Sequence, residues 1–310
     1  MVISSGSGSL VLVCAADDNY AMPLAVTVRS VLENLRNTCK VALFIIDGGI
    51  SQLNKRKIIK SLGSKRVDID IKWVQIDGSI LEEMKISGHI TIAAYYRLLI
   101  PQIVPKQFKK AIYLDSDLIV NRDLEQLWKL EIGENYLLAA QDTGAPYVSS
   151  SKGLRNYREL GIPPDFKYFN SGVLVINLEK WRTDSITLKV IEYLEQNKEQ
   201  VRWWDQDGLN AVLAGKWGEI DPRWNQTPFI YEYSSWKDSP FEEQVYKDVI
   251  DKPYIIHFAN KMKPWNLYYK HPYKNLFFRY ADKTAWAGLR WLFLWVRLNN
   301  RLKSIVAKKN

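Results

Sequence analysis

The feature that most constrains the fold is an alternation of strand-like and helix-like segments through the first half of the chain. The strand patterns are SLVLVCAADDNY (9–20), VALFIID (41–47) and DIDIKWVQID (68–77). Helical spacing follows over 21–35, with Pro23 near its start, and a second helix is expected from Ser51 to Gly63. This alternation predicts an α/β fold with a mostly parallel central sheet, whose ligands lie beyond the carboxyl ends of the strands.

The second half of the chain continues the alternation less regularly. The expected elements are a helix over 87–101 ended by Pro101, strands over 111–117 and 168–178, an amphipathic helix over 185–198, and a short helix over 204–215 with acidic residues in its first turn. Residues 144–166 are rich in Ser, Gly and Pro, so we expect a surface excursion or lid there.

Two aspartates, Asp115 and Asp117, interrupt the apolar stretch YLDSDLIV with only Ser116 between them. Like charges this close repel, which indicates a nearby cation, and hard carboxylate oxygens suit Mg²⁺ or Mn²⁺. The residues alone allow two other interpretations. One aspartate could cap the following turn while the other is solvated. Alternatively, the pair could begin an aspartyl-nucleophile phosphatase, although that class usually has Thr or Val where this chain has Ile119.

Length and composition indicate a globular protein. With 310 residues and 47% hydrophobic content, the chain can fill one large α/β core or two small ones. Cys14 and Cys39 match neither a disulfide framework nor a zinc site, so we expect both to be reduced and structural. The chain lacks a signal-peptide pattern and an apolar stretch of membrane-spanning length, so a cytoplasmic protein is expected.

A basic, tryptophan-rich tail over 284–310 predicts contact with a membrane surface. The chain has a net charge of +9, and this tail holds six basic side chains and no acidic one. On a helix, Trp291 and Trp295 would lie beside a stripe that includes Arg297, as in helices that bind anionic bilayers. We expect a domain over 1–283 and peripheral association with the inner face of the cell membrane through the tail. The alternative is a helix packed on the domain. Nucleic acid is not expected, because no binding module accompanies the basic residues.

Six segments resemble glycosyltransferase family eight, in the family's own order. They are AADDNYA (15–21), HITIAAYYRLLIP (89–101), YLDSD (113–117), YFNSGVLVINL (168–178), DQDGLN (205–210) and HFANKMKPW (257–265). The resemblance extends over about residues 10–266. It implies a GT-A fold, which is a Rossmann-like α/β domain, and retaining transfer from a nucleotide sugar, as in bacterial lipopolysaccharide galactosyl- and glucosyltransferases and the glycogenins.

The resemblance implies that Asp115, Asp117 and His257 coordinate Mn²⁺, with Mg²⁺ as the other option. An imidazole beside two carboxylates favours Mn²⁺. Lys263 would add positive charge at the leaving diphosphate. Without a metal site, His257 would be an ordinary histidine at a strand end and Lys263 a solvated lysine. Asn260 replaces a glycine that many members carry near the diphosphate, which puts that backbone contact in doubt.

For the nucleoside, the resemblance implies a pocket made by Ala15, Asp17, Asn19 and Tyr20. A carboxylate can accept the uracil imide N–H, an asparagine can pair with a carbonyl, and a tyrosine can stack on the base, which favours uridine. Arg97 and His89, at the family's spacing, would contact the donor, and Ser116 joins this set. Arg97 could instead be a structural partner of an aspartate in the metal site.

Near the sugar, the resemblance implies Asn170, Ser171, Gly172, Asp205 and Gln206. Small residues there would let the backbone approach the hexose. Gln206 would steady an oxocarbenium-like transition state, and Asp205 is the other candidate if a covalent intermediate forms. Asp207 is expected to serve the helix N-terminus.

Together these observations predict a Mn²⁺-dependent enzyme that moves glucose or galactose from UDP-glucose or UDP-galactose to a hydroxyl of a membrane-associated glycan or glycolipid. Acceptor specificity is expected in 144–166 and near Trp224–Asn225. The rivals are a non-catalytic sugar-nucleotide or membrane-binding protein and, more distantly, the phosphatase.

Overall fold

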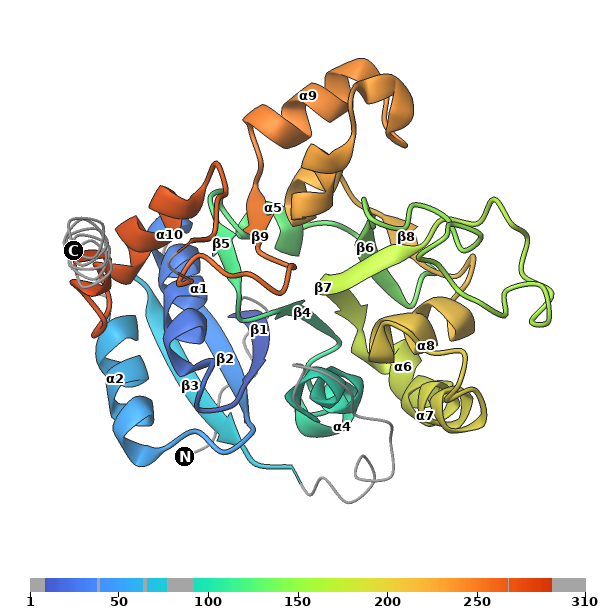
Figure 1. Ribbon diagram of the computed structural model, residues 1–310. Helices are drawn as coiled ribbons and strands as arrows, with labels where there is room; N and C mark the ends of the chain where they lie inside the picture. Colours follow the sequence, from blue (N-terminus) through green and yellow to red (C-terminus); the bar gives the residue numbers. More distant parts are fainter. Residues whose placement is uncertain (1–8, 38–39, 64–65, 77–91, 267, 292–310) are drawn as a thin grey trace, which may run out of the picture.

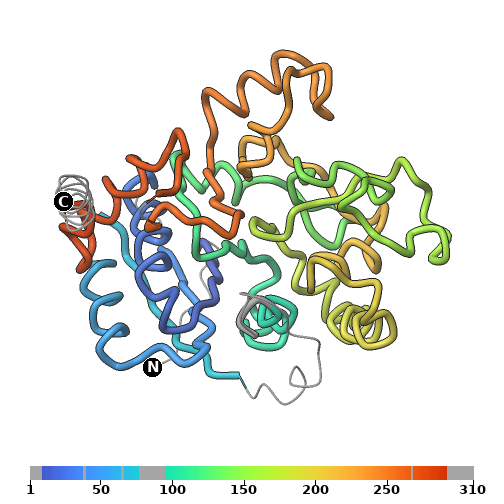
Figure 2. Tube along the Cα trace, in the orientation of Figure 1, coloured from blue at the N-terminus to red at the C-terminus, as the bar shows by residue number. Residues whose placement is uncertain are grey.

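A seven-stranded sheet forms the centre of the molecule, with helices on both of its faces (Figure 1). The structure is a computed structural model and describes residues 9–37, 40–63, 66–76, 92–266 and 268–291. The first third of the chain and its middle part lie at opposite ends of the sheet, blue and yellow-green in Figure 2. The centre of the sheet is therefore where two distant parts of the sequence meet.

The first part of the chain forms the parallel half of the sheet, as predicted. Its elements are β1 (Ser9–Ala16), α1 (Ala21–Asn34), β2 (Lys40–Asp47), α2 (Gln52–Leu62) and β3 (Asp68–Val74). Strands β1, β2 and β3 pair in parallel. The predicted limits of α2 are confirmed: the Ser51 side chain accepts a hydrogen bond from the Asn54 N–H at 3.3 Å, and Gly63 is the C-cap.

The second part of the sheet contains the antiparallel pairs. Its strands are β4 (Lys110–Leu114), β6 (Leu137–Gln141), β7 (Phe169–Asn177) and β8 (Gly218–Glu219). The order of the sheet is β3-β2-β1-β4-β7-β6-β8. Strand β7 is antiparallel to both β4 and β6, and the other pairs are parallel. The predicted mostly parallel α/β sheet is confirmed, with β7 inserted in the reverse direction.

A second, two-stranded sheet consists of β5 (Leu118–Val120) and β9 (Ile255–His257). The predicted strand over 111–117 therefore ends at Leu114, and the two aspartates lie in the link between β4 and β5. The predicted helix over 87–101 is wrong at its end, because 3-10 helix η1 (Ile92–Leu99) leads into α4 (Ile100–Ile103). Proline fits the first turn of a helix, so Pro101 lies inside α4 instead of ending a helix.

Two apolar cores hold the layers together. On one face of the sheet, α1 and α2 bury residues such as Leu24, Val28 and Ile58. On the other face, η1 and α4 pack beside α6 (Leu178–Thr183), α7 (Ile186–Gln196) and α8 (Trp204–Val212). Fully burying one such aliphatic side chain contributes about 1.5–3 kcal/mol to the stability of the fold, so this burial attaches both helical layers to the faces of the sheet.

The remaining elements lie beside the sheet. They are α5 (Glu125–Trp128), η2 (Pro222–Asn225), η3 (Pro228–Glu232), η4 (Trp236–Asp238), α9 (Glu243–Asp251) and α10 (Lys274–Ala281). The predicted excursion over 144–166 is built mostly of turns. Cys14 is free and buried in β1, and Cys39 lies outside the described residues.

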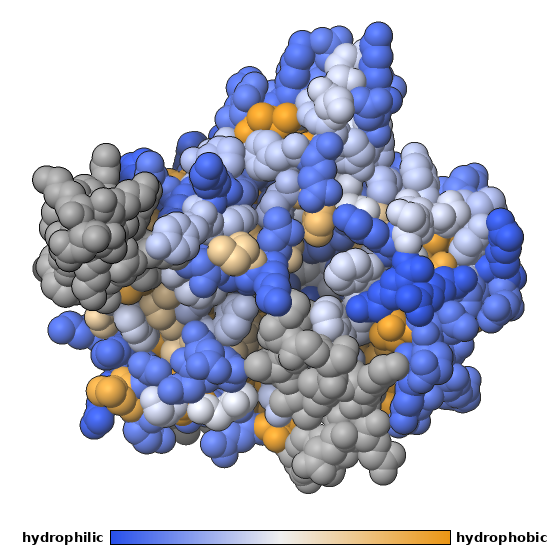
Figure 3. All heavy atoms as spheres, viewed as in Figure 1, coloured by the Kyte–Doolittle hydropathy of each residue, from blue (hydrophilic) through white to orange (hydrophobic). Residues whose placement is uncertain are grey.

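The beginning of the predicted tail packs on the domain. The Ala285 N–H donates to Ser61 Oγ at 2.8 Å, and the Lys57 ammonium lies 5.4 Å from the centre of the Trp286 ring. Trp291 is 66% exposed, and residues 292–310 lie outside the described part. The view in Figure 3 shows a mainly hydrophilic surface with scattered apolar side chains. In the described part of the chain, every helix is too short or too polar to cross a bilayer.

Candidate active site

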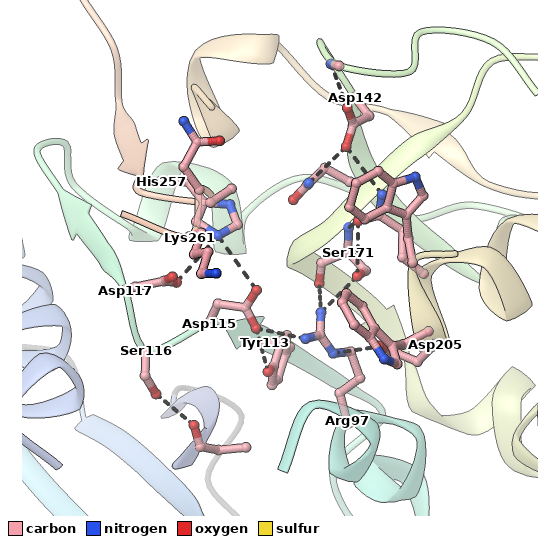
Figure 4. A pocket seen from close by; sticks show the side chains of 18 of the residues that line it. Arg97, Tyr113, Asp115, Ser116, Asp117, Asp142, Ser171, Asp205, His257 and Lys261 are labelled. Carbon is pink, nitrogen blue, oxygen red and sulfur yellow. Dashed lines mark hydrogen bonds and ion pairs between the residues drawn. The ribbon is translucent and has the colours of Figure 1, made fainter. Parts of the chain in front are cut away.

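A cavity of about 440 Å³ opens where β1 and β4 end and β7 begins (Figure 4). Because β7 runs antiparallel to β4, its first residues lie beside the carboxyl end of β4. The Asp115 N–H donates to the Gly172 carbonyl at 2.9 Å and continues this pairing past the strand. The reversed strand β7 thus places residues 169–172 at the same edge of the sheet as Asp17 and Asp115, which follow the parallel strands β1 and β4.

Three predicted metal ligands converge on one wall of the cavity. His257 Nε2 lies 3.6 Å from Asp115 Oδ2 and 3.4 Å from Asp117 Oδ1, and one ligand atom from each residue lies within 4.8 Å of the others. The β5–β9 pairing positions the histidine, because Leu118 is paired with His257 and the Phe258 N–H donates to the Asp117 carbonyl. Two carboxylates and an imidazole form a mixed oxygen and nitrogen donor set of the kind that binds divalent metal ions such as Mn²⁺.

Lys263 lies against the same carboxylates. Its Nζ is 2.6 Å from Asp117 Oδ2 and donates to the Phe258 carbonyl at 2.7 Å. Burial would raise the pKa of Asp117, but the positive charge and the hydrogen bond of Lys263 act against burial and help to lower that pKa. The Asp117 carboxylate is therefore ionised and can bind a cation.

Arg97 is buried between two carboxylates, as Figure 4 shows. Its Nη2 lies 3.0 Å from Asp115 Oδ1 and its Nε 2.9 Å from Asp205 Oδ2, while Nη1 donates to the carbonyl and hydroxyl of Ser171. The guanidinium also lies over the Tyr113 ring, and the Tyr113 hydroxyl donates to Asp115. The geometry gives Arg97 the structural role of linking η1 to the metal-ligand loop and to α8, and Arg97 also lines the cavity.

Gln206 is held by hydrogen bonds from two directions. Its Oε1 accepts from the Ser171 N–H at 3.0 Å, and its Nε2 donates to Asp142 Oδ2 at 3.2 Å. Asp142 also accepts from Asn170 and from the backbone N–H groups of residues 144 and 145. The carboxamide of Gln206 therefore has a fixed orientation at the cavity wall.

The two acidic residues of α8 have different surroundings. Burial raises the pKa of Asp205 to about 7, and Arg97 offsets part of that rise. Asp207 accepts from the Tyr168 hydroxyl and from the backbone N–H groups of Arg202 and Trp203, directly before the helix. This geometry agrees with the expectation that Asp207 serves the helix N-terminus.

The predicted nucleoside residues lie mostly at the end of β1. Ala15, Asp17, Tyr20 and Ser116 line the cavity, whereas Asn19 is exposed and is not among the lining residues. Asp17 accepts from the Tyr20 N–H at 3.0 Å, and the Ser116 hydroxyl donates to the Ala15 carbonyl at 2.7 Å. His89 lies outside the described residues.

The sequence analysis missed several residues of the cavity. They are Asp142, Gly144, Ala145, Lys152, Trp203, Trp204 and Phe229, together with Tyr113 and Lys261. Asp142 directly follows β6, a strand that was not predicted, so a search for acids after the apolar segment LLAAQ would have found it. The excursion contributes Gly144, Ala145 and Lys152, which places part of 144–166 at the cavity as expected. Trp224 and Asn225, near which acceptor specificity was expected, are both buried, and Asn225 contacts His257, so any acceptor contact near them stays a prediction.

Gly172 leaves room for the metal-ligand cluster. It is not among the residues that line the cavity, and a Cβ at this position would collide with the His257 ring and lie 2.8 Å from Asp115 Oδ2. The Gly172 backbone therefore lies close to His257 and Asp115, and its expected place beside the hexose stays a prediction.

We expect Gly172→Ala to weaken Mn²⁺ binding by about 5- to 100-fold, since relieving such overpacking costs roughly 1–3 kcal/mol and must displace His257 or Asp115. Titration with Mn²⁺ followed by electron paramagnetic resonance measures the affinity. Gly63→Ala is the matched control, because its Cβ would approach only the Lys60 carbonyl, at 3.7 Å. Equal Mn²⁺ affinity in both variants would contradict the steric argument.

Comparisons with known proteins agree with one another. The family model for glycosyl transferase family 8 matches residues 11–268. General stress protein A of Bacillus subtilis is 34% identical over 278 residues, which cover 89% of this chain and 94% of that protein. Lipopolysaccharide 1,2-glucosyltransferase of Escherichia coli is 27% identical, over 86% of this chain and 80% of that protein. The crystal structure of galactosyltransferase LgtC with donor and acceptor sugar analogues has a TM-score of 0.76 and 28% identity, over 89% of this chain and 96% of that chain.

The sheet order, the cavity at its centre and these likenesses define a glycosyltransferase with the GT-A fold. Within that class, the chain belongs to glycosyltransferase family 8.

Proposed function

We propose that this protein is a Mn²⁺-dependent, retaining hexosyltransferase that moves glucose or galactose from a UDP-sugar to a hydroxyl of a glycan or glycolipid. The observation that carries the proposal is the convergence of Asp115, Asp117 and His257 at the wall of a cavity that Arg97 and Lys263 also line. The proposal draws further support from relatives named as a lipopolysaccharide 1,2-glucosyltransferase and a lipopolysaccharide 1,3-galactosyltransferase.

The metal would be held by one carboxylate oxygen each from Asp115 and Asp117 and by His257 Nε2. A bound divalent ion supplies Lewis-acid stabilisation of the charge on a departing diphosphate. Lys263 contributes a second positive charge in the same place. Its ammonium contacts Asp117, so it is already oriented toward the position that the phosphates would take.

The nucleoside would lie at the end of β1. Tyr20 offers a ring for stacking and Asp17 an acceptor for the base, and Ala15 and Ser116 allow close approach. Asn19 and His89 stay in the proposal as donor contacts. Arg97 lines the cavity near the proposed position of the sugar, in addition to bridging Asp115 and Asp205.

Gln206 would face the sugar carbon at which transfer occurs, with Asn170 and Ser171 beside the hexose. An amide is a poor nucleophile, so Gln206 would stabilise an oxocarbenium-like transition state while the acceptor enters on the side from which the diphosphate leaves. Asp205 remains the candidate for a covalent route. Its pairing with Arg97 and its pKa of about 7 disfavour it as a nucleophile at neutral pH.

A single set of assays tests the proposal. The protein is incubated with Mn²⁺ and either UDP-glucose or UDP-galactose, and UDP release is followed with and without EDTA. Metal-dependent release from one of these donors supports the proposed transfer. Tight UDP binding without release on any acceptor would favour a non-catalytic binding protein, and release of phosphate from a phosphomonoester would favour the phosphatase.

The acceptor would be assembled at the inner face of the cell membrane, where the basic tail over 284–310 would hold the enzyme. We expect deletion of 284–310 to spare UDP release in solution and to abolish sedimentation with anionic vesicles, because the tail carries six basic side chains and three tryptophans. Since residues 285–286 pack on α2, a second deletion of 292–310 keeps those contacts and serves as the control for folding. Undiminished sedimentation of both truncated proteins would contradict the anchor.

A further inference from the structure

Buried side chains form a continuous line of hydrogen bonds that ends at the imidazole of His257. Asn170 Nδ2 donates to Asp142 Oδ2 at 2.9 Å, Asn225 Nδ2 lies 2.8 Å from Asn170 Oδ1, and His257 Nδ1 lies 2.9 Å from Asn225 Oδ1. All four residues are less than 9% exposed. The line connects the residue after β6 with β7, η2 and β9, and Asp142, Asn170 and His257 also line the cavity.

The direction of each hydrogen bond in this line is fixed by backbone N–H groups, which can only donate. The Gly172 backbone N–H, which can only donate, points at Asn170 Oδ1 at 3.0 Å. The backbone N–H groups of Gly144 and Ala145 donate to Asp142 Oδ1, so that carboxylate accepts on its other oxygen too. Asn170 must therefore present its oxygen to Asn225, which must then donate to Asn170 and turn its own oxygen toward His257.

An oxygen facing Nδ1 requires that Nδ1 carry the proton of the neutral imidazole. Nε2 is then a bare lone pair, and it faces Asp115 and Asp117 at 3.6 and 3.4 Å. The Nε2 lone pair and the two carboxylates are all hydrogen-bond acceptors, so they repel one another unless a cation lies between them. A metal-binding histidine needs this arrangement, in which its other ring nitrogen donates to a neighbouring group.

We propose that Asn225 is a positioning residue that selects the metal-binding tautomer of His257, and that Asp142 and Asn170 hold Asn225 in the required orientation. The inference rests on the proposed metal site and adds how this chain prepares that site before any metal arrives. It also assigns Asp142 a second task, because the same carboxylate oxygen orients Gln206. One acidic residue thereby aligns both the histidine and the glutamine of the proposed mechanism.

The test uses the metal-free, full-length protein labelled with ¹⁵N-histidine, in alkaline buffer where imidazole groups are neutral. The ¹⁵N chemical shifts report which ring nitrogen carries the proton, and the His257 signals are those lost in His257→Gln. We expect the Nδ1–H tautomer in the wild type. In Asn225→Leu the carboxylates of Asp115 and Asp117 attract the proton to Nε2, so the tautomer reverses and Mn²⁺ affinity falls about 10- to 100-fold.

Two further variants separate an effect on the His257 tautomer from a general loss of stability. Asn225→Asp keeps an oxygen facing Nδ1 and should retain the Nδ1–H tautomer, at a cost in stability because its other oxygen faces Asn170 Oδ1. Asn210→Leu removes another buried asparagine, 1% exposed against 2% for Asn225, whose carboxamide binds only backbone groups of residues 169 and 206. This variant should lose stability without changing the His257 signals.

An Nε2–H tautomer in the wild type, an unchanged tautomer in Asn225→Leu, or an equal change in Asn210→Leu would each overturn the inference. Wild-type protein with the Nδ1–H tautomer that binds no Mn²⁺, or that releases no UDP, would instead overturn the proposed metal site or the proposed function. The spectrum is recorded without metal, so the two failures are distinguishable.

Discussion

Replacing Asp117 with asparagine is expected to lower metal-dependent UDP release by about a thousandfold, because a metal ion supplies several kcal/mol of charge stabilisation in the transition state. Asp117 is 8% exposed, and His257 and Lys263 both contact its carboxylate. An amide in its place has the same shape but lacks the charge that holds a cation. Initial rates of UDP release across a Mn²⁺ titration measure the loss, which excess metal should not restore fully.

Asp123→Asn is the matched control for this variant. Asp123 is also buried, at 6% exposure, and belongs to the same part of the chain, but its carboxylate only accepts from the Glu125 N–H and does not line the cavity. We expect its rate to stay within about threefold of the wild type, since weakening one side-chain to backbone hydrogen bond of this kind costs about 1 kcal/mol in stability. Full activity in Asp117→Asn would refute the metal role of that residue.

Replacing Arg97 with methionine is expected to destabilise the metal-free protein by about 3–5 kcal/mol, because Asp115 and Asp205 lose their shared positive partner. Urea denaturation followed by tryptophan fluorescence measures the free energy of unfolding. Activity should fall as well, since Arg97 also fixes Ser171 through two hydrogen bonds.

This loss should depend on pH in a specific direction. In the wild type, the pKa of Asp205 is raised to about 7, whereas its pKa in the unfolded chain is near 4. The protonated carboxyl therefore contributes fully to stability below about pH 4, and this contribution is lost as the pH rises through about 7. Without Arg97, which lowers that pKa, the folded carboxyl resists ionisation further. The deficit of the variant should therefore be larger above about pH 7 than well below it.

Two comparisons isolate this charge effect. Arg182→Met removes an arginine that donates only to the carbonyls of Pro101, Val104 and Phe108, so its deficit should not change over the same pH range. Adding Asp205→Asn to the Arg97 variant should recover part of the stability, because one uncompensated carboxylate is gone. A pH-independent deficit that Asp205→Asn fails to relieve would show that Arg97 acts by packing alone.

Local signals in the sequence predicted the elements whose limits depend on neighbouring residues. The buried strand over 41–47 and the helix from Ser51 to Gly63 are examples, since a capping side chain and a run of apolar residues act within a few positions. The helix expected to end at Pro101 failed because proline can begin a helical turn as well as end one.

Pairing between distant strands could not be predicted in the same way. The strand pattern over 168–178 is the same whether a strand runs parallel or antiparallel, and only the sheet order shows that β7 is reversed. That reversal places Asn170 and Ser171 at the cavity and turns Gly172 toward His257. The hydrogen bonds of Asn225 could not be predicted for a similar reason, because they join residues that are far apart in the sequence.

The pairing of β5 with β9 also has a consequence for biosynthesis. This short ladder brings His257 to Asp115 and Asp117, and β9 is synthesised long after the two aspartates. Contacts between such distant residues form late in folding, because loop closure must precede them. A growing polypeptide therefore cannot assemble the three-residue cluster until synthesis has passed β9, however early its two aspartates emerge.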